Sequence, residues 1–289
     1  PYTTLFRSDI LQKLQNLGLK NKTSFEVLAE QKQYPDLIKQ GKYTLNNGMS
    51  NNALINKLRL GEQDEINVQI NASRIQTKAE LASLIGNQLM CDSAELIALH
   101  KDDAYLYNAF QLKSSTSLTL IIPNTYRFRW TTSADDFLKR MAREYKAFWT
   151  EERKLKANKI DLSQSEVAIL ASIVQKESHI YSEKRKIAGV YINRLKKGML
   201  LQADPTLIFA KGDPSIRRVL NKDKEIESPY NTYKYKGLPP GPIALPSIVS
   251  LDAVLNHEDH DYLYFVAKPG GRGESNYAKS YSEHLRNAR

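Results

Sequence analysis

Glu177 is the residue of this chain whose surroundings best suit acid–base chemistry. It lies near the end of the apolar stretch ILASIVQKES (residues 169–178), and on a helix it projects within roughly 20° of Leu170. A carboxyl group on an apolar helix face is desolvated, which raises its pKa and suits it to donate and accept a proton near neutral pH. The alternative is a structural role, in which Glu177 ends the helix and pairs with Lys184 or Arg185.

The helix that presents Glu177 is predicted to follow the polar run DLSQSE (residues 161–166), where Ser163 or Ser165 can cap it. Its apolar residues recur with the period of one buried helix face. His179, just beyond the helix, could tune the pKa of the acid, although a surface position is the simpler interpretation. The same periodicity directs the polar residues of the helix toward water, and these are Ser172, Gln175 and Lys176.

The segment LQADPT (residues 201–206) supplies two further polar candidates. Asp204 precedes a proline, which restricts the backbone and suits Asp204 to cap a helix that begins at the proline. The amide of Gln202 is suited to a sugar hydroxyl or an acetamido group. Asp204 and Glu183 also stay open as a second acid beside Glu177.

Two later segments have the chemistry of a carbohydrate cleft. YNTY (residues 230–233) combines two aromatic rings with an amide and a hydroxyl, and sugar faces stack on rings while sugar edges take hydrogen bonds. GLPPGPIALP (residues 237–246) has four prolines and two glycines, which predicts a rigid irregular loop. As ordinary turns and connectors, both segments would be equally plausible.

The elements that must position these residues predict an α+β fold in two parts. Residues 1–75 are predicted to form a small module that resembles a LysM-type wall-binding fold, and residues 76–289 a larger mixed α/β catalytic domain with a connecting region to about residue 160. In the small module we expect helices at 9–18, 24–31 and 51–61 and strands at 41–45 and 67–72. Further along we expect helices at 77–89, 93–100 and 134–158, strands at 117–128 and 262–267, and a hairpin-like turn at 270–273.

Several segments, in this order, resemble the YceG/MltG-like family of endolytic murein transglycosylases. They are ILASIVQKES, VYINRLKKGMLLQADPT, SPYNTYKYKGLPPGPIALPS, SLDAVLNHEDHDYLYFVAK and the final YSEH, preceded by GKYTLNNGMS, LIIPNTYRF and TSADDFLKRM. The likeness therefore covers nearly the whole chain.

The resemblance implies roles for individual residues. Glu177 occupies the position of the catalytic glutamate. The positions that match those lining or shaping the family's cleft are Asn193, Arg194, Gln202, Asp204, Asn231, Tyr233 and Pro240, the last within the Pro239–Pro242 loop. The chain departs from the family at Gln175, where many relatives have a second acid, and at Ser275 and Tyr277, where relatives commonly have histidine and phenylalanine. The role of the segment from Ser275 to His284 therefore stays open.

The resemblance implies a lytic transglycosylase, an enzyme that needs a single carboxyl group and no cofactor. Such an enzyme cuts between N-acetylmuramic acid and N-acetylglucosamine, and the 6-hydroxyl of the sugar replaces water as the nucleophile, leaving a 1,6-anhydro-muramyl end. Its expected role is to limit the length of nascent strands. The alternatives are a non-catalytic wall-binding or scaffolding protein, and a pyridoxal-phosphate lyase. The lyase would need a Schiff-base lysine and a phosphate cup, and neither has a suitable sequence context.

Composition narrows the partners. The 289 residues include 42 Lys and Arg against 32 Asp and Glu, a net charge of +10, which favours anionic partners such as nucleic acid, membrane surfaces or wall polymers. The densest basic run, KRKIAGVYINRLKK (residues 184–197), is predicted to be a solvated helix face, and no nucleic-acid-binding signature is present. The expected partners are therefore peptidoglycan glycan strands, with a peptidoglycan synthase as a second candidate.

Metal binding and internal disulfides are not expected. Cys91 is the single cysteine, which excludes an internal disulfide and a cysteine metal cluster. His257 and His260 lie in NHEDHD, which is most simply a polar turn. No stretch of the sequence approaches the roughly 20 apolar residues of a membrane span. The resemblance implies a transmembrane anchor upstream of this chain and a catalytic part on the extracytoplasmic face of the bacterial inner membrane.

Overall fold

The computed structural model describes residues 2–213, 215–216 and 219–289, and the chain divides into two compact units. The first unit comprises Pro1–Val68, Gly86–Cys91 and Tyr126–Ser133. The second unit comprises Gln69–Ile85, Asp92–Thr125 and Ala134–Arg289. Two short segments thus return to the first unit after the chain has entered the second, and a domain boundary at residue 75 stays a prediction.

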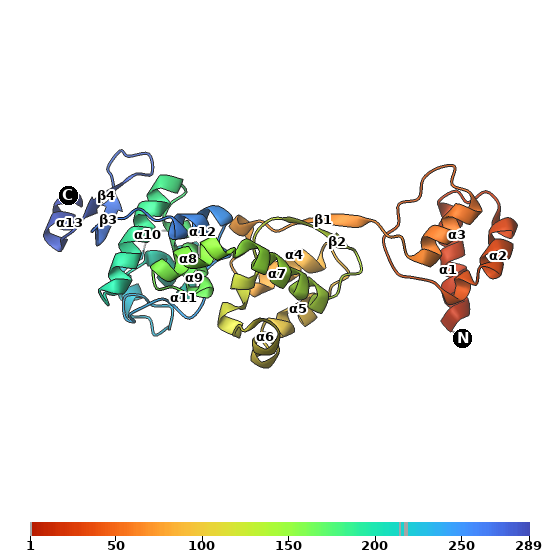
Figure 1. Cartoon of the computed structure of the whole chain (residues 1–289), viewed down its shortest axis with the longest axis horizontal. Helices are drawn as coiled ribbons and strands as arrows, with labels where there is room; N and C mark the ends of the chain where they lie inside the picture. Colours follow the sequence, from red (N-terminus) through yellow and green to blue (C-terminus); the bar gives the residue numbers. More distant parts are fainter. Residues whose placement is uncertain (1, 214, 217–218) are drawn as a thin grey trace. The chain divides into compact units, whose positions relative to one another are not determined.

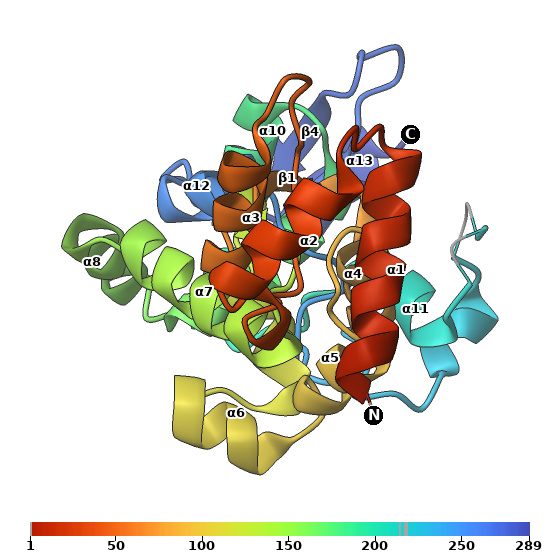
Figure 2. The same ribbon diagram turned by 90° about the vertical axis from the view of Figure 1, so that its right-hand side faces the viewer.

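Helices dominate the first unit, and Figures 1 and 2 show them side by side. Their bounds are Tyr2–Asn16 for α1, Lys22–Gln31 for α2 and Asn51–Leu60 for α3, with a 3-10 turn at Tyr34–Asp36. The side chains of Asn21 and Ser50 cap α2 and α3 by accepting hydrogen bonds from backbone N–H groups of the first turn. The helices bury one apolar cluster, formed by Leu11, Leu14, Phe25, Ala29, Tyr34, Leu54, Ile55 and Leu58. The three helices predicted in this region are confirmed.

Strands β1 (Glu65–Gln69) and β2 (Thr125–Arg129) form a two-stranded sheet. The strand predicted at 41–45 is absent, and that prediction is wrong. This segment is instead held by Asp64, whose carboxylate accepts a hydrogen bond of 2.6 Å from the backbone N–H of Thr44. The Asp64 carboxylate thus satisfies a backbone N–H group that would otherwise need an acceptor on a neighbouring strand.

The strand predicted at 117–128 forms only in its second half, as β2. Its first half belongs to a 3-10 helix, η3 (Ser114–Leu120). The hydroxyls of Ser117 and Thr119 donate to backbone carbonyls three residues earlier, at 2.9 and 2.7 Å. Such local side-chain bonds compete with strand formation, so a sequence rich in β-branched residues is held in a helical turn.

The second unit is built mainly from helices. The prediction of a single long helix at 134–158 is wrong, because the helix is interrupted at residues 149–150. The side chain of Thr150 caps a new helix that begins at Glu151, and Trp149 is buried in the core at 2% exposure. The helices are α4 (Lys78–Gly86), α5 (Ser93–Leu99), α6 (Asp103–Phe110), α7 (Ala134–Phe148), α8 (Glu151–Lys159), α9 (Gln164–Glu177), α10 (Tyr181–Lys196), α11 (Asp204–Lys211), α12 (Ile248–Leu255) and α13 (Tyr281–Asn287), with 3-10 turns η2 (Ala72–Arg74) and η4 (Asn221–Glu225).

Helix α9 is the centre of the second unit and packs against α10, α11 and α12. All residues from Val167 to Val174 are buried, so the helix is enclosed on every side along this stretch. The prediction that Ser172 faces water is therefore wrong. The basic run at 184–197 is also not a solvated face, because it forms α10 and leaves Lys184 only 6% and Arg194 only 7% exposed.

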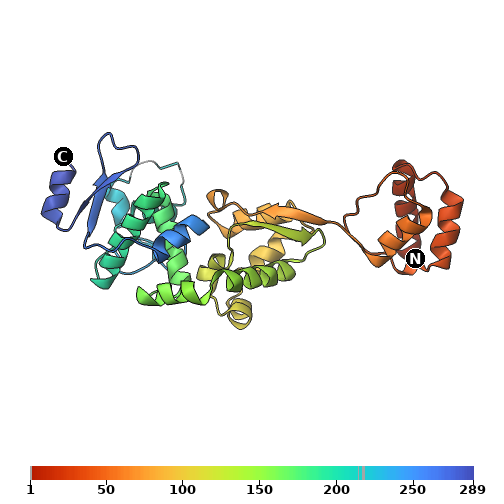
Figure 3. The ribbon, with the colours of Figure 1, turned by 45° about the horizontal axis from the view of Figure 1, so that its top comes forward.

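A β-hairpin and a short helix end the chain (Figure 3). Strands β3 (Tyr264–Ala267) and β4 (Ser275–Ala278) pair antiparallel, with Phe265 opposite Tyr277. The predicted turn between them is confirmed, and Gly270 and Gly273 adopt the left-handed conformation that favours glycine. Helix α13 follows β4 directly. None of the helices seen in the described residues is long and apolar enough to cross a membrane.

Candidate active site

Glu177 is the last residue of α9, where local sequence signals place it. The hydroxyl of Ser163 accepts a hydrogen bond from the backbone N–H of Glu166, and the Glu166 carboxylate accepts one from the backbone N–H of Ser163. This capping box fixes the start of the helix. The predicted helix and its cap at Ser163 are confirmed, and the phase of the helix brings Glu177 to the edge of the core, where it is partly exposed.

The carboxyl group of Glu177 opens into a cavity of about 380 Å³. This volume falls within the roughly 300–1,000 Å³ of small-molecule sites. Five of the eight residues predicted for the site line it together. Among the described residues, those that line the cavity are Glu177, Tyr191, Arg194, Leu201, Gln202, Asp204, Lys224, Tyr233, Tyr264, Phe265, Tyr281 and His284.

Tyr191 is the direct partner of the acid. Its hydroxyl donates a hydrogen bond of 2.6 Å to Oε1 of Glu177. Desolvation raises the pKa of Glu177 to about 7, the Tyr191 hydrogen bond acts against this rise, and the negative charge of Asp204 adds to it. Glu177 is thus poised to change its protonation state near neutral pH, as a general acid and base must.

Glu177 does not pair with Lys184 or Arg185, as its structural alternative required. Lys184 donates from Nζ to the hydroxyl of Ser250 at 2.9 Å, and Arg185 donates from Nε to the backbone carbonyl of Asn256 at 2.5 Å. Both cations thus fasten α10 to the region of α12. The acid is bonded to a neutral hydroxyl instead, and its carboxyl group faces a cavity.

Arg194 and Gln202 form one side of the cavity. The guanidinium of Arg194 donates to the backbone carbonyls of Leu201 at 2.8 Å and Leu263 at 2.7 Å, and to Oε1 of Gln202 at 3.3 Å. Gln202 has a φ of +52°, a left-handed conformation that costs free energy for a residue other than glycine and clusters at functional sites. The backbone is therefore held by Arg194 so that this amide faces the cavity.

Asp204 and Tyr233 form a second polar pair in the cavity lining. The prediction that the Asp204 side chain caps a helix is wrong, because Asp204 is the first residue of α11 and the cap position is Ala203. Its Oδ1 instead accepts a hydrogen bond of 2.5 Å from the hydroxyl of Tyr233. Desolvation, followed by this bond to the carboxylate, raises the pKa of Tyr233. The pair brings together the DPT and YNTY motifs, whose members lie far apart in sequence.

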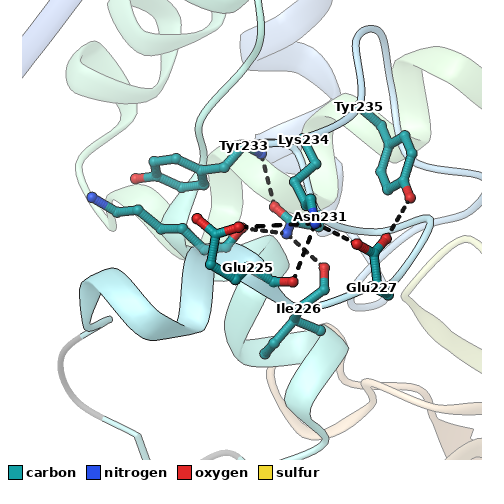
Figure 4. A network of polar contacts seen from close by, with 8 residues as sticks. Glu225, Ile226, Glu227, Asn231, Tyr233, Lys234 and Tyr235 are labelled. Atoms are coloured by element: carbon teal, nitrogen blue, oxygen red, sulfur yellow. Dashed lines mark hydrogen bonds and ion pairs between the residues drawn. The ribbon is translucent and has the colours of Figure 1, made fainter.

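The three remaining predicted site residues lie outside the cavity lining. Asn193 donates from Nδ2 to the backbone carbonyls of His260 at 2.6 Å and Tyr262 at 3.1 Å. Asn231 is fully buried, and Figure 4 shows it at the centre of a polar network, where it accepts a hydrogen bond of 2.9 Å from the backbone N–H of Tyr233. It therefore shapes the turn that presents Tyr233. Pro240 is an exposed loop residue.

The proline-rich loop is tied to α9 by the two polar side chains that were expected to face water. The hydroxyl of Ser172 accepts from the backbone N–H of Ile243 at 3.0 Å. The amide of Gln175 donates to the carbonyl of Leu245 at 3.0 Å and accepts from the N–H of Ser247 at 2.6 Å. These bonds position the loop relative to the helix that carries Glu177.

Glycine allows the same loop to lie close to η3. A Cβ added to Gly241 would be only 2.1 Å from the backbone carbonyl oxygen of Ser115. The loop therefore depends on a residue without a side chain at this point.

Sequence reasoning had singled out none of Tyr191, Lys224, Tyr264, Phe265 or His284 for the site. Each lies in or near a recognised motif, yet nothing in its local pattern sets it apart from a core aromatic or a surface cation. Glu183, an open candidate for a second acid, is absent from the lining because its Oε2 accepts from the backbone N–H of Ser275 and the hydroxyl of Tyr277 at 2.9 and 2.8 Å. Ser275 and Tyr277, where the sequence predicted a departure from the family, thus hold Glu183 in place.

The described residues contain no cluster of His, Cys, Asp and Glu suited to a metal ion. In NHEDHD, the ring of His260 contacts the backbone carbonyl of Lys186 through Nε2 at 3.0 Å and accepts from the backbone N–H of Tyr262 through Nδ1 at 3.2 Å. Nδ1 therefore accepts, and Nε2 is left to donate to the Lys186 carbonyl. His179 is exposed and lies in the connection between α9 and α10.

Comparison with known proteins shows the family of this chain. The YceG-like family profile matches residues 6–289, and the chain therefore belongs to the YceG-like family. A crystal structure of a yceG-like protein from Listeria monocytogenes shares the fold with a TM-score of 0.64 and 26% identity, covering 96% of this chain and 94% of that one.

Curated relatives carry a functional name. An endolytic murein transglycosylase of Bacillus subtilis (strain 168) is 35% identical over an alignment of 262 residues, and the alignment covers 84% of this chain and 70% of that protein. Another, from Streptococcus pneumoniae serotype 2 (strain D39), is 29% identical over an alignment of 307 residues, and the alignment covers 95% of this chain and 54% of that protein. The chain thus spans about half the length of the pneumococcal relative.

Proposed function

We propose that the protein is an endolytic lytic transglycosylase that cuts peptidoglycan strands between N-acetylmuramic acid and N-acetylglucosamine. The observation that carries the proposal is the carboxyl group of Glu177, which faces a cavity, has a pKa raised to about 7 and accepts a hydrogen bond from Tyr191. The names of the curated relatives supply the substrate class.

One carboxyl group is sufficient for both proton transfers. Glu177 first gives its proton to the glycosidic oxygen, the bond from that oxygen to C1 of the muramyl residue breaks, and the N-acetylglucosamine side leaves as an alcohol. The 6-hydroxyl of the same muramyl residue then attacks C1, and its proton passes to the Glu177 carboxylate. The anhydro ring closes without water, and Glu177 returns to its protonated form.

The polar walls support this chemistry. Positive charge develops at C1 in the transition state of glycoside cleavage, and the carboxylate of Asp204, held by Tyr233, is a fixed negative group on the same cavity. The amide of Gln202 is placed to orient an acetamido group. Because Asp204 is already bonded to a hydroxyl, it acts as a charge stabiliser, and Glu177 carries the protons.

The setting of the enzyme extends the proposal. The first unit acts as a LysM-like module, the chain works on the extracytoplasmic side of the membrane with its tether upstream, and cutting limits the length of strands made by a partner synthase. The helices of the first unit and the net charge of +10 are compatible with binding to an anionic wall polymer.

Mass spectrometry of the digestion products tests the reaction. Purified glycan strands treated with the protein should yield fragments with anhydro-muramyl ends, whereas hydrolysis yields reducing ends that are one water heavier. Predominantly reducing ends would refute the transglycosylase mechanism. No cutting by the folded protein, combined with retained glycan binding, would support the non-catalytic wall-binding alternative.

A further inference from the structure

Three ring side chains from the last part of the chain gather in the lining of the cavity. The rings of Tyr264 and His284 are stacked, with centroids 5.4 Å apart and planes at 27°. The ring centroid of Tyr281 lies 5.8 Å from that of Tyr264 and 6.2 Å from that of His284. We call these three residues the terminal aromatic cluster, and all of them line the cavity that contains Glu177.

The terminal aromatic cluster is connected to the acid through β3. Phe265, the residue after Tyr264, meets the ring of Tyr191 edge-on at 5.9 Å, and Tyr191 holds Glu177. On the other side, the guanidinium of Arg194 lies 5.1 Å from the centre of the Tyr264 ring. The orientation of Tyr264 is therefore set by β3, Arg194 and His284, so the cluster is a built wall of the cavity.

His284 adds a neutral ring to this wall. Desolvation and the nearby charge of Arg194 lower the pKa of His284 below its ordinary value, which favours the neutral imidazole. Its Nδ1 is buried and has no hydrogen-bond partner among the residues the structure describes. An unsatisfied buried polar atom costs free energy, so ring contacts with Tyr264 and Tyr281, and not a hydrogen bond at Nδ1, hold His284 in the cluster.

Tyr281 is poorly covered for a residue packed in such a cluster. It is 60% exposed, and Leu285 on the same helix is 45% exposed. Exposed apolar surface beside a cavity is a feature of binding sites. An exposed aromatic ring beside a cavity suits a pyranose, whose axial C–H groups stack on rings.

We propose that Tyr281, Tyr264 and His284 form a sugar-stacking subsite that binds one N-acetylhexosamine ring of the glycan strand, displaced along the strand from the bond that Glu177 cleaves. The proposal rests on the function proposed above, because it assumes that the strand runs through this cavity. It assigns to the C-terminal segment, and above all to α13, a role in holding the substrate.

Binding in a catalytically inactive background tests the subsite. The parent is Glu177→Gln, and the probe is a purified, uncrosslinked glycan strand fraction of defined length, with affinity measured by isothermal titration calorimetry. Tyr281→Ala in this background should weaken binding about five-fold, as expected for the loss of one stacking contact of roughly 1 kcal/mol. Tyr281→Phe keeps the ring and should bind like the parent.

A matched control separates stacking from a general surface effect. Tyr235 is also exposed, at 47%, and its hydroxyl bonds to Glu227 outside the cavity lining, so Tyr235→Ala should not change the affinity. The subsite proposal is overturned if Tyr281→Ala binds the strand as tightly as the parent does. It is also overturned if Tyr235→Ala loses as much affinity as Tyr281→Ala, or if the parent binds no strand. Tyr281-dependent binding together with a wild-type protein that does not cut would refute the transglycosylase reaction and leave the subsite standing.

Discussion

Tyr191→Phe is expected to move the pH dependence of cutting toward higher pH. The Tyr191 hydroxyl donates to Oε1 of Glu177 at 2.6 Å and holds the pKa of Glu177 below the value that burial alone would produce. Phenylalanine keeps the ring contact with Phe265 at 5.9 Å and removes only the donor. Desolvation and the charge of Asp204, which both raise the pKa, then act unopposed.

The magnitude follows from the strength of the lost bond. A hydrogen bond to a charged group contributes about 1.5–3 kcal/mol, and each pKa unit corresponds to about 1.4 kcal/mol. The pKa of Glu177 should thus rise by about one to two units from its starting value of about 7. The protonated acid begins the reaction, so activity is lost as pH rises through this pKa, and the alkaline limb should move upward by the same amount.

The assay is the initial rate of anhydro-end formation from glycan strands, measured between about pH 5 and pH 9 for wild type and variant. Tyr235→Phe is the matched control, since it removes a hydroxyl bonded to Glu227 outside the cavity lining, and its profile should equal that of wild type. An alkaline limb that stays in place or moves to lower pH in Tyr191→Phe would contradict the assignment of Glu177 as the acid tuned by Tyr191.

Further predictions follow from the same contacts. Asp204→Asn removes a charge that raises the pKa of Glu177, so its alkaline limb should move to lower pH, and an upward shift would argue against the electrostatic coupling. Glu177→Gln should reduce the rate by about 10²- to 10⁴-fold. The folded pKa of Glu177, about 7, lies above the ordinary 4.5, so wild type loses stability as pH rises between these values. Urea unfolding should accordingly show the variant more stable by up to about 3 kcal/mol above pH 7 and nearly equal below pH 4.5; a destabilised variant at pH 8 would reveal a structural role. Ser172→Ala leaves the buried N–H of Ile243 without its acceptor and should cost about 1–3 kcal/mol in the same measurement, an effect that exposed Ser282→Ala should lack. Gly241→Ala creates a 2.1 Å contact with the Ser115 carbonyl and should lower the melting temperature by several degrees; an unchanged melting curve would mean that the loop moves freely.

Local sequence determined the helix that carries the acid and the place of the acid on it. The cap at Ser163 and the apolar period of α9 each depend on residues within about one turn of one another. The interactions that decide them can therefore be predicted from a short stretch of sequence. The same holds for the β3–β4 turn, where Gly270 and Gly273 supply backbone conformations that other residues adopt at a cost. The resemblance of ordered motifs added the family, which the whole-chain match confirmed.

Tertiary structure decided which polar residues meet. Gln175 and Ser172 looked solvent-directed in the helix period, yet their partners are backbone groups of the proline-rich loop about 70 positions away. Asp204 looked like a helix cap, and a tyrosine 29 positions later became its partner instead. A hydrogen bond across such separations depends on the packing of whole elements, and no short-range pattern encodes it.

The composition of the cavity wall was likewise settled by the fold. Tyr191 lies on α10, the helix that follows the one carrying Glu177. Tyr264, Tyr281 and His284 reach the same cavity only because β3 packs against α10 and α13 packs against the β3–β4 hairpin. Periodicity identified a carboxyl group on an apolar surface. Its raised pKa, its hydroxyl partner and the rings facing it are properties of desolvation and distance, which exist only once these separate segments are packed together.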